Sequence, residues 1–264
     1  MSIYEYQPLL IFLVIVAAMF GAAMGSFLNC AAYRVVHGES FLKGRSKCPS
    51  CGHLLGALEL IPILSWLIQR GRCKACGQKI SVRYLLTELA FACITVLCLL
   101  RFDLTVLCLR NYVFLCCLFL LTLTDLEGML IPDGCHIIAV IAWVVTLPFL
   151  FTGWGDVGLR ILAALLFGGG LLVISLVMDH LLGRDSLGGG DIKLFAVVGL
   201  YLGILGTLFT LMLSCILGLL FHLLSRAGEE EEKAFPFGPA IAVAAGAMLL
   251  FGEPLLNWYR GLLL

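Results

Sequence analysis

Residues 104–133 read LTVLCLRNYVFLCCLFLLTLTDLEGMLIPD. The apolar run in this stretch covers residues 104–124 and is followed directly by Asp125. A second apolar stretch opens with LGGGDIKL at residues 187–194 and carries Asp191. A carboxylate at the end of a membrane-length apolar segment is costly, so it is a functional candidate by default. The two aspartates therefore mark a candidate site at the ends of membrane helices.

The composition agrees with a membrane protein. Of 264 residues, 61% are hydrophobic and 13% are charged, and the mean hydropathy is +1.07. Soluble domains carry roughly 25% charged residues. Because 17 basic residues balance 17 acidic ones, the net charge gives no reason to expect a nucleic-acid partner. The expected fold is an all-α polytopic membrane protein embedded in a lipid bilayer.

A helix needs roughly 20 apolar residues to cross a bilayer. Such stretches predict about eight transmembrane helices, at residues 9–32, 84–101, 104–124, 135–153, 157–180, 191–205, 206–225 and 237–252. The sixth and seventh are nearly continuous, and we expect Gly203 and Gly206 to form a tight turn between them, because glycine accepts the backbone angles of a reversal. Without that turn, the C-terminus would lie on the other side of the membrane.

The distribution of positive charge predicts the orientation. Nine of the 17 Lys and Arg residues lie between the first two apolar segments, namely Arg34, Lys43, Arg45, Lys47, Arg70, Arg72, Lys74, Lys79 and Arg83. The positive-inside rule places this segment in the cytoplasm. Residues 1–8 contain no Lys or Arg and no signal-peptide cleavage site follows, so the first helix is expected to be retained. With eight spans, both aspartates then lie at the cytoplasmic face of the membrane.

Residues 33–83 are expected to form a loop domain between a first helix, residues 1–32, and a helical core, residues 84–264. About 50 residues bury little apolar surface, so the domain needs a further stabilising element. Cys48-Pro49-Ser50-Cys51 and Cys73-Lys74-Ala75-Cys76 have the spacing of a structural four-cysteine zinc site. Two disulfides are the alternative, which the reducing cytoplasm disfavours. The other eight cysteines are interpreted as small hydrophobic residues.

Neighbouring residues leave alternatives open around each aspartate. Gly188, Gly189 and Gly190 would let an extended peptide approach Asp191, although Asp191 could simply be a helix N-cap. Lys193 is expected to influence the ionisation of Asp191, to hold a phosphate head group, or to reach the membrane interface. The competing acids are interpreted as structural or solvated: Glu88 as a buried partner of a basic group, and Glu127, Asp133 and the run at 229–232 as loop residues.

Two carboxyl groups that share one proton are sufficient to activate water against a peptide bond. The chain therefore has the features of a membrane aspartic peptidase. A proton-coupled transporter would also explain intramembrane acids and glycine runs, but not the zinc module. A non-catalytic assembly protein that docks a partner through the zinc module is a third hypothesis.

Taken together, the motifs resemble the bacterial prepilin peptidases, membrane enzymes of type IV pilus, type II secretion and competence systems. The resemblance covers most of the chain and rests on an ordered series: GSFLN (25–29) with Tyr33-Arg34, RSKCPSC (45–51), LIPILSW (60–66), GRCKAC (71–76), ISVRY (80–84), Asp125 with IPD (131–133), GGGDIKL (188–194) and PFGP (236–239). Val36, Leu85 and Leu187 depart from the usual pattern without removing a reacting group.

The resemblance implies a G-x-G-D aspartic peptidase in which Asp125 and Asp191 are catalytic, with Gly188, Gly190 and Lys193 supporting the active site. Such enzymes cut the leader of prepilins or pseudopilins at the cytoplasmic face, after a glycine and before a hydrophobic segment. Many members with the cysteine loop also methylate the new N-terminal amine, which implies S-adenosylmethionine as a second cofactor beside zinc.

Overall fold

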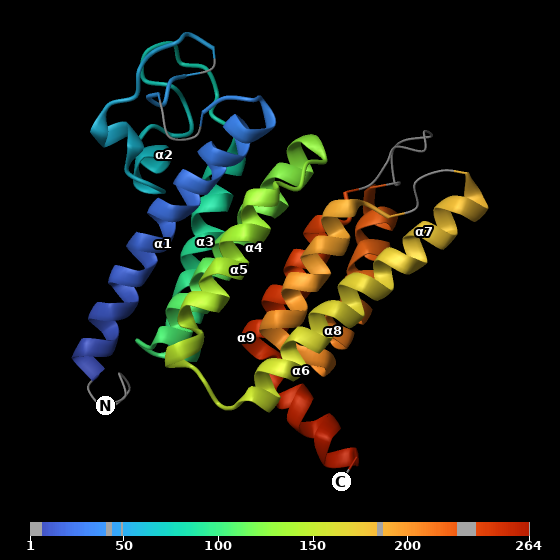
Figure 1. Ribbon diagram of the computed structural model, residues 1–264. Coiled ribbons are helices and arrows are strands. Elements are labelled where there is room, and N and C mark those ends of the chain that lie inside the picture. Colours follow the sequence, from blue (N-terminus) through green and yellow to red (C-terminus); the bar gives the residue numbers. More distant parts are fainter. Residues whose placement is uncertain (1–6, 41–43, 49, 184–186, 226–235, 264) are drawn as a thin grey trace. The chain divides into compact units, whose positions relative to one another are not determined.

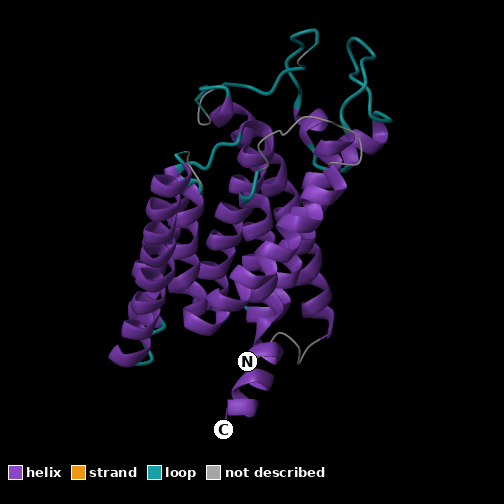
Figure 2. Cartoon of the chain, turned by 90° about the vertical axis from the view of Figure 1, so that its right-hand side faces the viewer, coloured by secondary structure: helices purple, strands orange, loops and turns teal. Residues whose placement is uncertain are grey.

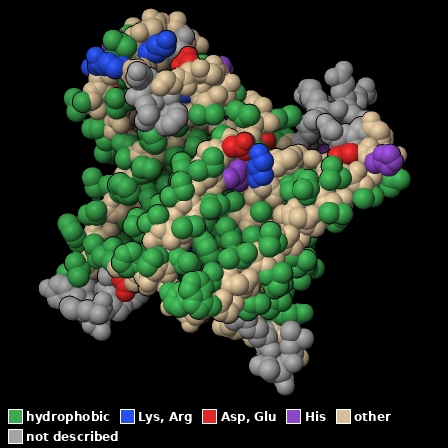
Figure 3. All heavy atoms as spheres, viewed as in Figure 1, with side chains coloured by type: hydrophobic (Ala, Val, Ile, Leu, Met, Phe, Trp, Pro, Cys, Tyr) green, Lys and Arg blue, Asp and Glu red, His purple; other side chains and the backbone are tan. Residues whose placement is uncertain are grey.

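The computed structural model describes residues 7–40, 44–48, 50–183, 187–225 and 236–263. These residues form helices and connecting loops, with two isolated β-bridges and no extended strand in the described ranges (Figure 2). The chain divides into two compact units, Met1–Cys108 and Leu109–Leu264. Hydrophobic side chains cover much of the surface of the long helices in Figure 3, as expected of helices that face lipid.

In the first unit, α1 (Gln7–Val36) packs lengthwise against α3 (Val82–Phe102) (Figure 1). The contact is close because small residues meet there. A β-carbon on Gly21 would lie 2.5 Å from the Thr95 hydroxyl, and one on Gly25 would lie 2.9 Å from the Thr87 carbonyl oxygen. The two glycines form a G-x-x-x-G motif, which lets membrane helices approach backbone to backbone.

The segment between α1 and α3 contains the short helices η2 (Ala57–Leu60) and α2 (Leu64–Ile68). Basic side chains gather on this module in Figure 3, as the positive-charge pattern predicts. The buried Glu88 of α3 anchors the module, since its carboxylate accepts a 2.6 Å hydrogen bond from the backbone N–H of Ile63. The prediction of a structural role fits this contact, although the bonded group is a backbone amide instead of a basic side chain.

The second unit contains the remaining helices, which follow the predicted spans with shifted ends. These are α4 (Val106–Gly128, whose first three residues belong to the first unit), α5 (Asp133–Thr146) extended by η3 (Leu147–Phe149), α6 (Trp154–Ala164), the π-helical turn η4 (Leu165–Gly169), α7 (Gly170–Leu182), α8 (Gly189–Ser225) and α9 (Gly238–Leu263). Helix α9 extends beyond the predicted end at residue 252, and α6, η4 and α7 form one long apolar stretch.

Helix α8 reverses its direction at Gly203, whose backbone angles of φ 68° and ψ −173° are not helical. Near its start, Gly190 packs on Ile131, and near its end Gly218 packs against the ring of Phe237. Phe237 adjoins Gly238, which is bonded to the end of α4, so both ends of α8 lie at the same end of this unit. A straight helix would separate Gly190 from Gly218, 28 positions later, by about 42 Å. The predicted turn is confirmed at Gly203, whereas Gly206 is helical.

The reversal is held from the neighbouring helices. Arg160 of α6 donates through Nη1 to the carbonyl oxygens of Tyr201, at 2.7 Å, and Leu200, at 3.3 Å. These carbonyls lie at the end of the first half of α8, where an interrupted helix leaves backbone acceptors unpaired. The Tyr201 hydroxyl donates to the Ala139 carbonyl oxygen of α5 at 2.8 Å. The far end of this half-helix is therefore fixed by both α5 and α6.

Six helical stretches in the described ranges are long and apolar enough to span a membrane, and Asp133–Phe149 is a shorter seventh. One of the six is α8, counted as Gly189–Leu223. Because α8 folds back at Gly203, it supplies two helical segments, which brings the number of apolar segments to the predicted eight, although the first of the two is only about 22 Å long. The fold is therefore an all-α polytopic bundle with a four-cysteine module between its first two long helices.

Candidate active site

Asp125 lies in the last turn of α4 and is 5% exposed. Its Oδ2 accepts a 3.0 Å hydrogen bond from the backbone N–H of Gly238, the first residue of α9. A helix N-terminus presents unpaired N–H groups and a positive dipole end, both of which favour a carboxylate. A β-carbon on Gly238 would lie 2.6 Å from this oxygen, so only glycine allows the approach. The sequence showed Gly238 only as part of PFGP, and its contact with Asp125 was not predicted.

Asp191 is the third residue of α8 and is 7% exposed. It therefore lies within the first turn and is not the N-cap that the sequence left open. Its Oδ1 is buried without a hydrogen-bond partner in the described part of the chain. Buried polar atoms are nearly always paired, so an orphaned carboxylate oxygen requires an explanation, and a catalytic role is one.

The structure brings both aspartates to the same end of the second unit. Met129 ends α4 in a left-handed conformation, φ 51°, which non-glycine residues seldom adopt. The chain then passes Ile131, whose side chain fills the space beside Gly190, next to Asp191. The two carboxyl groups are close enough for the charge of Asp125 to act on Asp191. The structure therefore places two buried acids at the same helix ends.

The three glycines before Asp191 have different surroundings. A β-carbon on Gly190 would meet the Ile131 side chain at 2.7 Å, so packing requires this glycine. A β-carbon on Gly188 would lie 3.1 Å from the Asp191 carboxylate, and Gly189 has open space beside it. The backbone just before Asp191 is thus accessible, as the approach of an extended peptide would require.

Lys193 and Asp133 form an ion pair next to this end of α8. The Lys193 ammonium lies 2.7 Å from Oδ1 of Asp133, the first residue of α5. Both side chains are more than half exposed. Asp133 is solvated as predicted but belongs to a helix, and Glu127 is less buried than Asp125. The burial pattern therefore separates Asp125 from its two competitors.

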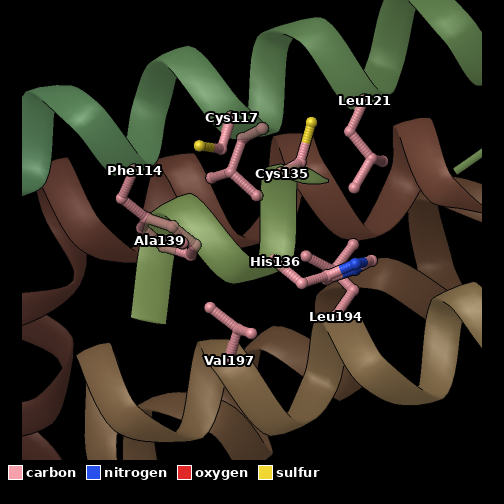
Figure 4. Close-up of a pocket in the computed structure, with 9 residues that line it drawn as sticks. Phe114, Cys117, Leu121, Cys135, His136, Ala139, Leu194 and Val197 are labelled. Atoms are coloured by element: carbon pink, nitrogen blue, oxygen red, sulfur yellow. The ribbon is translucent and has the colours of Figure 1, made fainter. Parts of the chain in front are cut away.

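A small cavity of about 10 Å³ lies between α4, α5 and α8 (Figure 4). Leu121 and Leu194 line it, each about one helical turn from an aspartate, and the imidazole of His136 lies beside Leu194. His136 is the polar member of an otherwise apolar lining. Both of its ring nitrogens are buried without a hydrogen-bond partner in the described residues, although Nδ1 lies 4.0 Å from Oδ1 of Asp133. The cavity has room for about one water molecule.

The four cysteines of the loop form one cluster, in which all sulfur atoms lie within 4.8 Å of one another. Both halves fold alike. The N–H of Cys48 donates to the His53 carbonyl oxygen, the N–H of Cys73 donates to that of Gln78, and both bonds are 2.9 Å long. Gly52 and Gly77, which follow the second cysteine of each pair, both have φ 72°. The two C-x-x-C-G segments are thus a repeated knuckle.

The cluster fits a tetrahedral metal. Zn–S bonds of about 2.3 Å place thiolates about 3.8 Å apart in a tetrahedron, and the Cys48 and Cys76 sulfurs lie 4.0 Å apart. Backbone N–H groups of Cys51 and Ser50 lower the pKa of the Cys48 thiol to about 6, whereas burial and the neighbouring thiols raise the pKa of Cys51 to about 11, so Cys48 is the thiol of this pair that ionises first. Glu59 accepts hydrogen bonds from the Gly56 N–H and the His53 ring, and these hold the pKa of its carboxyl below the usual value.

Comparison with known proteins places this architecture in a family. The family described as Bacterial Peptidase A24 N-terminal domain matches residues 19–102, and the Type IV leader peptidase family matches residues 112–223. No solved structure gives a significant match.

Curated relatives match along most of the chain. A prepilin leader peptidase/N-methyltransferase of Bacillus subtilis is 34% identical over 91% of this chain and 95% of its own length. Two further relatives have the same name. The protein from Aeromonas salmonicida is 35% identical over 83% of this chain and 76% of its own length. The protein from Dichelobacter nodosus is 31% identical over 93% of both chains. The chain therefore belongs to the type IV leader peptidase family.

Proposed function

We propose that this chain is a membrane aspartic endopeptidase that removes the leader of type IV prepilins or pseudopilins and then N-methylates the new N-terminus. The observation that carries the peptidase proposal is the pair of buried carboxyl groups, Asp125 and Asp191, at one end of a membrane bundle. The relatives' shared name supports both activities. The basic module supports placement of the site at the cytoplasmic face of the inner membrane.

The two aspartates have different surroundings, which suggests different roles. The Gly238 N–H stabilises negative charge on Asp125, so Asp125 is the partner that takes a proton from the attacking water. Asp191, protonated on its unpaired Oδ1, donates a hydrogen bond toward the peptide carbonyl. As the tetrahedral intermediate collapses, the proton held by Asp125 passes to the leaving amine. Because the charge of Asp125 acts on Asp191, we treat their titration as a property of the pair.

The open backbone at Gly188 and Gly189 is where we place the substrate. An extended segment around the cleavage site lies there beside Asp191, while the hydrophobic part of the prepilin remains among the helices. The leader then extends into the cytoplasm. A site at the helix ends suits this substrate, because its scissile bond joins a polar leader to an apolar segment.

Incubation of the detergent-purified chain with a synthetic prepilin peptide tests the function. We expect one cut, after the glycine that precedes the hydrophobic segment, and mass spectrometry of the product reports the cut position. With S-adenosylmethionine present, the product should gain the mass of one methyl group. An intact peptide would contradict the peptidase proposal, and a cut but unmethylated product would contradict the second activity.

We propose that Cys48, Cys51, Cys73 and Cys76 hold a structural Zn²⁺. A closed four-thiolate site leaves no open position for water, so the metal stabilises the module and does not take part in peptide hydrolysis. S-adenosylmethionine does not fit the cavity beside His136, which holds about one water. We therefore assign no methyl-transfer residue in that cavity.

Replacement of Cys48 or Cys76 by serine should reduce the bound zinc from about one ion per chain to nearly none, because metal binding to such sites is coupled to folding. The module should also become sensitive to protease. Elemental analysis and limited proteolysis of the purified protein measure both effects. Cys93→Ser is the matched control, since Cys93 is an exposed residue of α3 outside the cluster. Two disulfides in place of zinc would leave metal content at zero in the unmodified chain.

The ion pair between Lys193 and Asp133 is proposed to support the turn that carries Asp191. Exposed pairs contribute about 0–1 kcal/mol, so Asp133→Asn should lower kcat by no more than about fivefold. Lys193→Glu should have a larger effect, because it removes the ion pair and places a second negative charge beside Asp133. The exchange Asp133→Lys with Lys193→Asp should restore part of the rate. An exchange that is no more active than Lys193→Glu alone would argue against a positioning role.

A further inference from the structure

Two cysteines outside the zinc cluster face each other where α3 connects to α4. The sulfur atoms of Cys98 and Cys108 lie 3.9 Å apart. Each sulfur also approaches the backbone carbonyl oxygen of the other residue, at 3.8 Å and 3.7 Å. Both residues belong to the first unit, and the reciprocal contacts show that their backbones are close as well.

The connection between the helices holds this arrangement rigidly. Asp103 ends α3 with φ 55°, a left-handed conformation, and its carboxylate accepts the N–H of Leu104 at 2.7 Å. Thr105 then caps α4, since its hydroxyl accepts the N–H of Cys108 at 3.1 Å. The N-cap bond is made to Cys108 itself. The turn therefore fixes where the second sulfur lies.

The position in the membrane differs from that of the zinc cysteines. Helix α3 starts next to the zinc module at Val82 and is 21 residues, or about 31 Å, long, which is enough to cross the hydrocarbon core. The turn at Asp103 thus lies at the opposite membrane face. With the zinc module in the cytoplasm, as proposed above, this face is the oxidising one, where disulfides persist.

We propose that Cys98 and Cys108 are a redox site that forms an intramolecular disulfide on the extracytoplasmic face. A disulfide needs a sulfur separation of about 2.05 Å and α-carbons about 4.4–6.8 Å apart. Side-chain rotation can close the 3.9 Å gap between the sulfurs, because the backbones already lie close together. The bond closes the short turn between the two helices.

The exposure of the two thiols predicts the order of events. Cys108 is partly exposed, whereas Cys98 is 1% exposed. The Cys108 thiol, after losing its proton, attacks the disulfide of an extracytoplasmic thiol–disulfide oxidoreductase and releases one thiolate of that oxidant. The Cys98 thiol then loses its proton and attacks the Cys108 sulfur, which releases the second thiolate. Two protein thiols are oxidised by two electrons, and one oxidant disulfide is reduced to a dithiol.

The full-length protein in its native membranes allows a direct test. Free thiols are blocked with N-ethylmaleimide and the protein is digested with trypsin, which cuts after Arg101 between the two cysteines. A disulfide then joins two peptides that a reductant separates. We expect the joined pair in the unmodified chain and in Cys93→Ser, and its loss in Cys98→Ser and Cys108→Ser. If both cysteines were still alkylated by N-ethylmaleimide after exposure to oxidised glutathione, the proposal would be overturned.

The single variants test the order of reaction. In the Cys98→Ser variant, oxidised glutathione should add one glutathionyl group to Cys108, because the resolving thiol is missing. In the Cys108→Ser variant, it should add none to Cys98, which is buried. The reverse labelling would overturn the assigned roles. The readout does not depend on prepilin cleavage by this chain, so an inactive peptidase would still give the joined peptides after tryptic digestion. Failure of this inference and failure of the proposed function are therefore distinguishable.

Discussion

Asp125→Asn and Asp191→Asn each lower the rate of prepilin cleavage by about 10²–10⁴-fold, the range that acid–base groups contribute. Asparagine keeps the shape of the side chain, so both proteins should still insert and fold. It neither ionises nor shares a proton, and each half of the pair needs the other. Cleavage of a prepilin peptide by purified protein, followed by mass spectrometry under single-turnover conditions, measures the loss.

Two acids near the same helix ends serve as controls. Glu127→Gln and Asp133→Asn should stay within about fivefold of the unmodified rate, because partly exposed charges and surface ion pairs contribute about 0–1 kcal/mol. Residues that act as one unit are not additive, so the double variant of Asp125 and Asp191 should be about as slow as the slower single variant. Substantial cleavage by either single variant would exclude the pair as the catalytic apparatus.

Gly238→Ala should reduce kcat by about 100-fold, the usual cost of displacing a catalytic group by about 1 Å. The new β-carbon would lie 2.6 Å from Oδ2 of Asp125, and in a buried site the carboxylate must move away from its N–H donor. The loss should fall on kcat more than on KM, since the change affects the reacting group and not the substrate surface.

Helix α9 offers a matched control for this variant. A β-carbon on Gly246 would meet the Leu115 side chain at 3.6 Å, an ordinary contact, so Gly246→Ala should leave cleavage unchanged. Alanine is also the better helix former, which favours folding. If Gly238→Ala cleaved as fast as Gly246→Ala, the contact between Gly238 and Asp125 would have no part in catalysis.

Features set by local chemistry could be predicted from the sequence. Thiolate spacing indicated the four-cysteine cluster, and apolar run lengths indicated the helices. The reversal at Gly203 was expected because few residues other than glycine adopt its angles. The G-x-x-x-G pattern of Gly21 and Gly25 was visible in the sequence, but its use in packing α1 on α3 required the partner helix.

Features that depend on tertiary structure could not be predicted in this way. Gly238 and Asp125 are 113 positions apart, and no local pattern connects them. Met129 is not a residue type that favours a left-handed backbone, so its conformation is imposed by the surrounding packing. For the same reason, Lys193 was expected near Asp191, but its partner Asp133 on another helix was not identified.

The first half of α8 is a short rigid rod with the Asp191 carboxyl near one end and the Tyr201 clamp near the other. The ten positions between them correspond to about 15 Å, and a helix hardly stretches or twists over that length. Arg160 and the Ala139 carbonyl therefore set the height and rotation of Asp191 from a distance. If Asp191 is catalytic, as proposed, its alignment depends on contacts about 15 Å away, and packing around α5 and α6 becomes a variable of the active site.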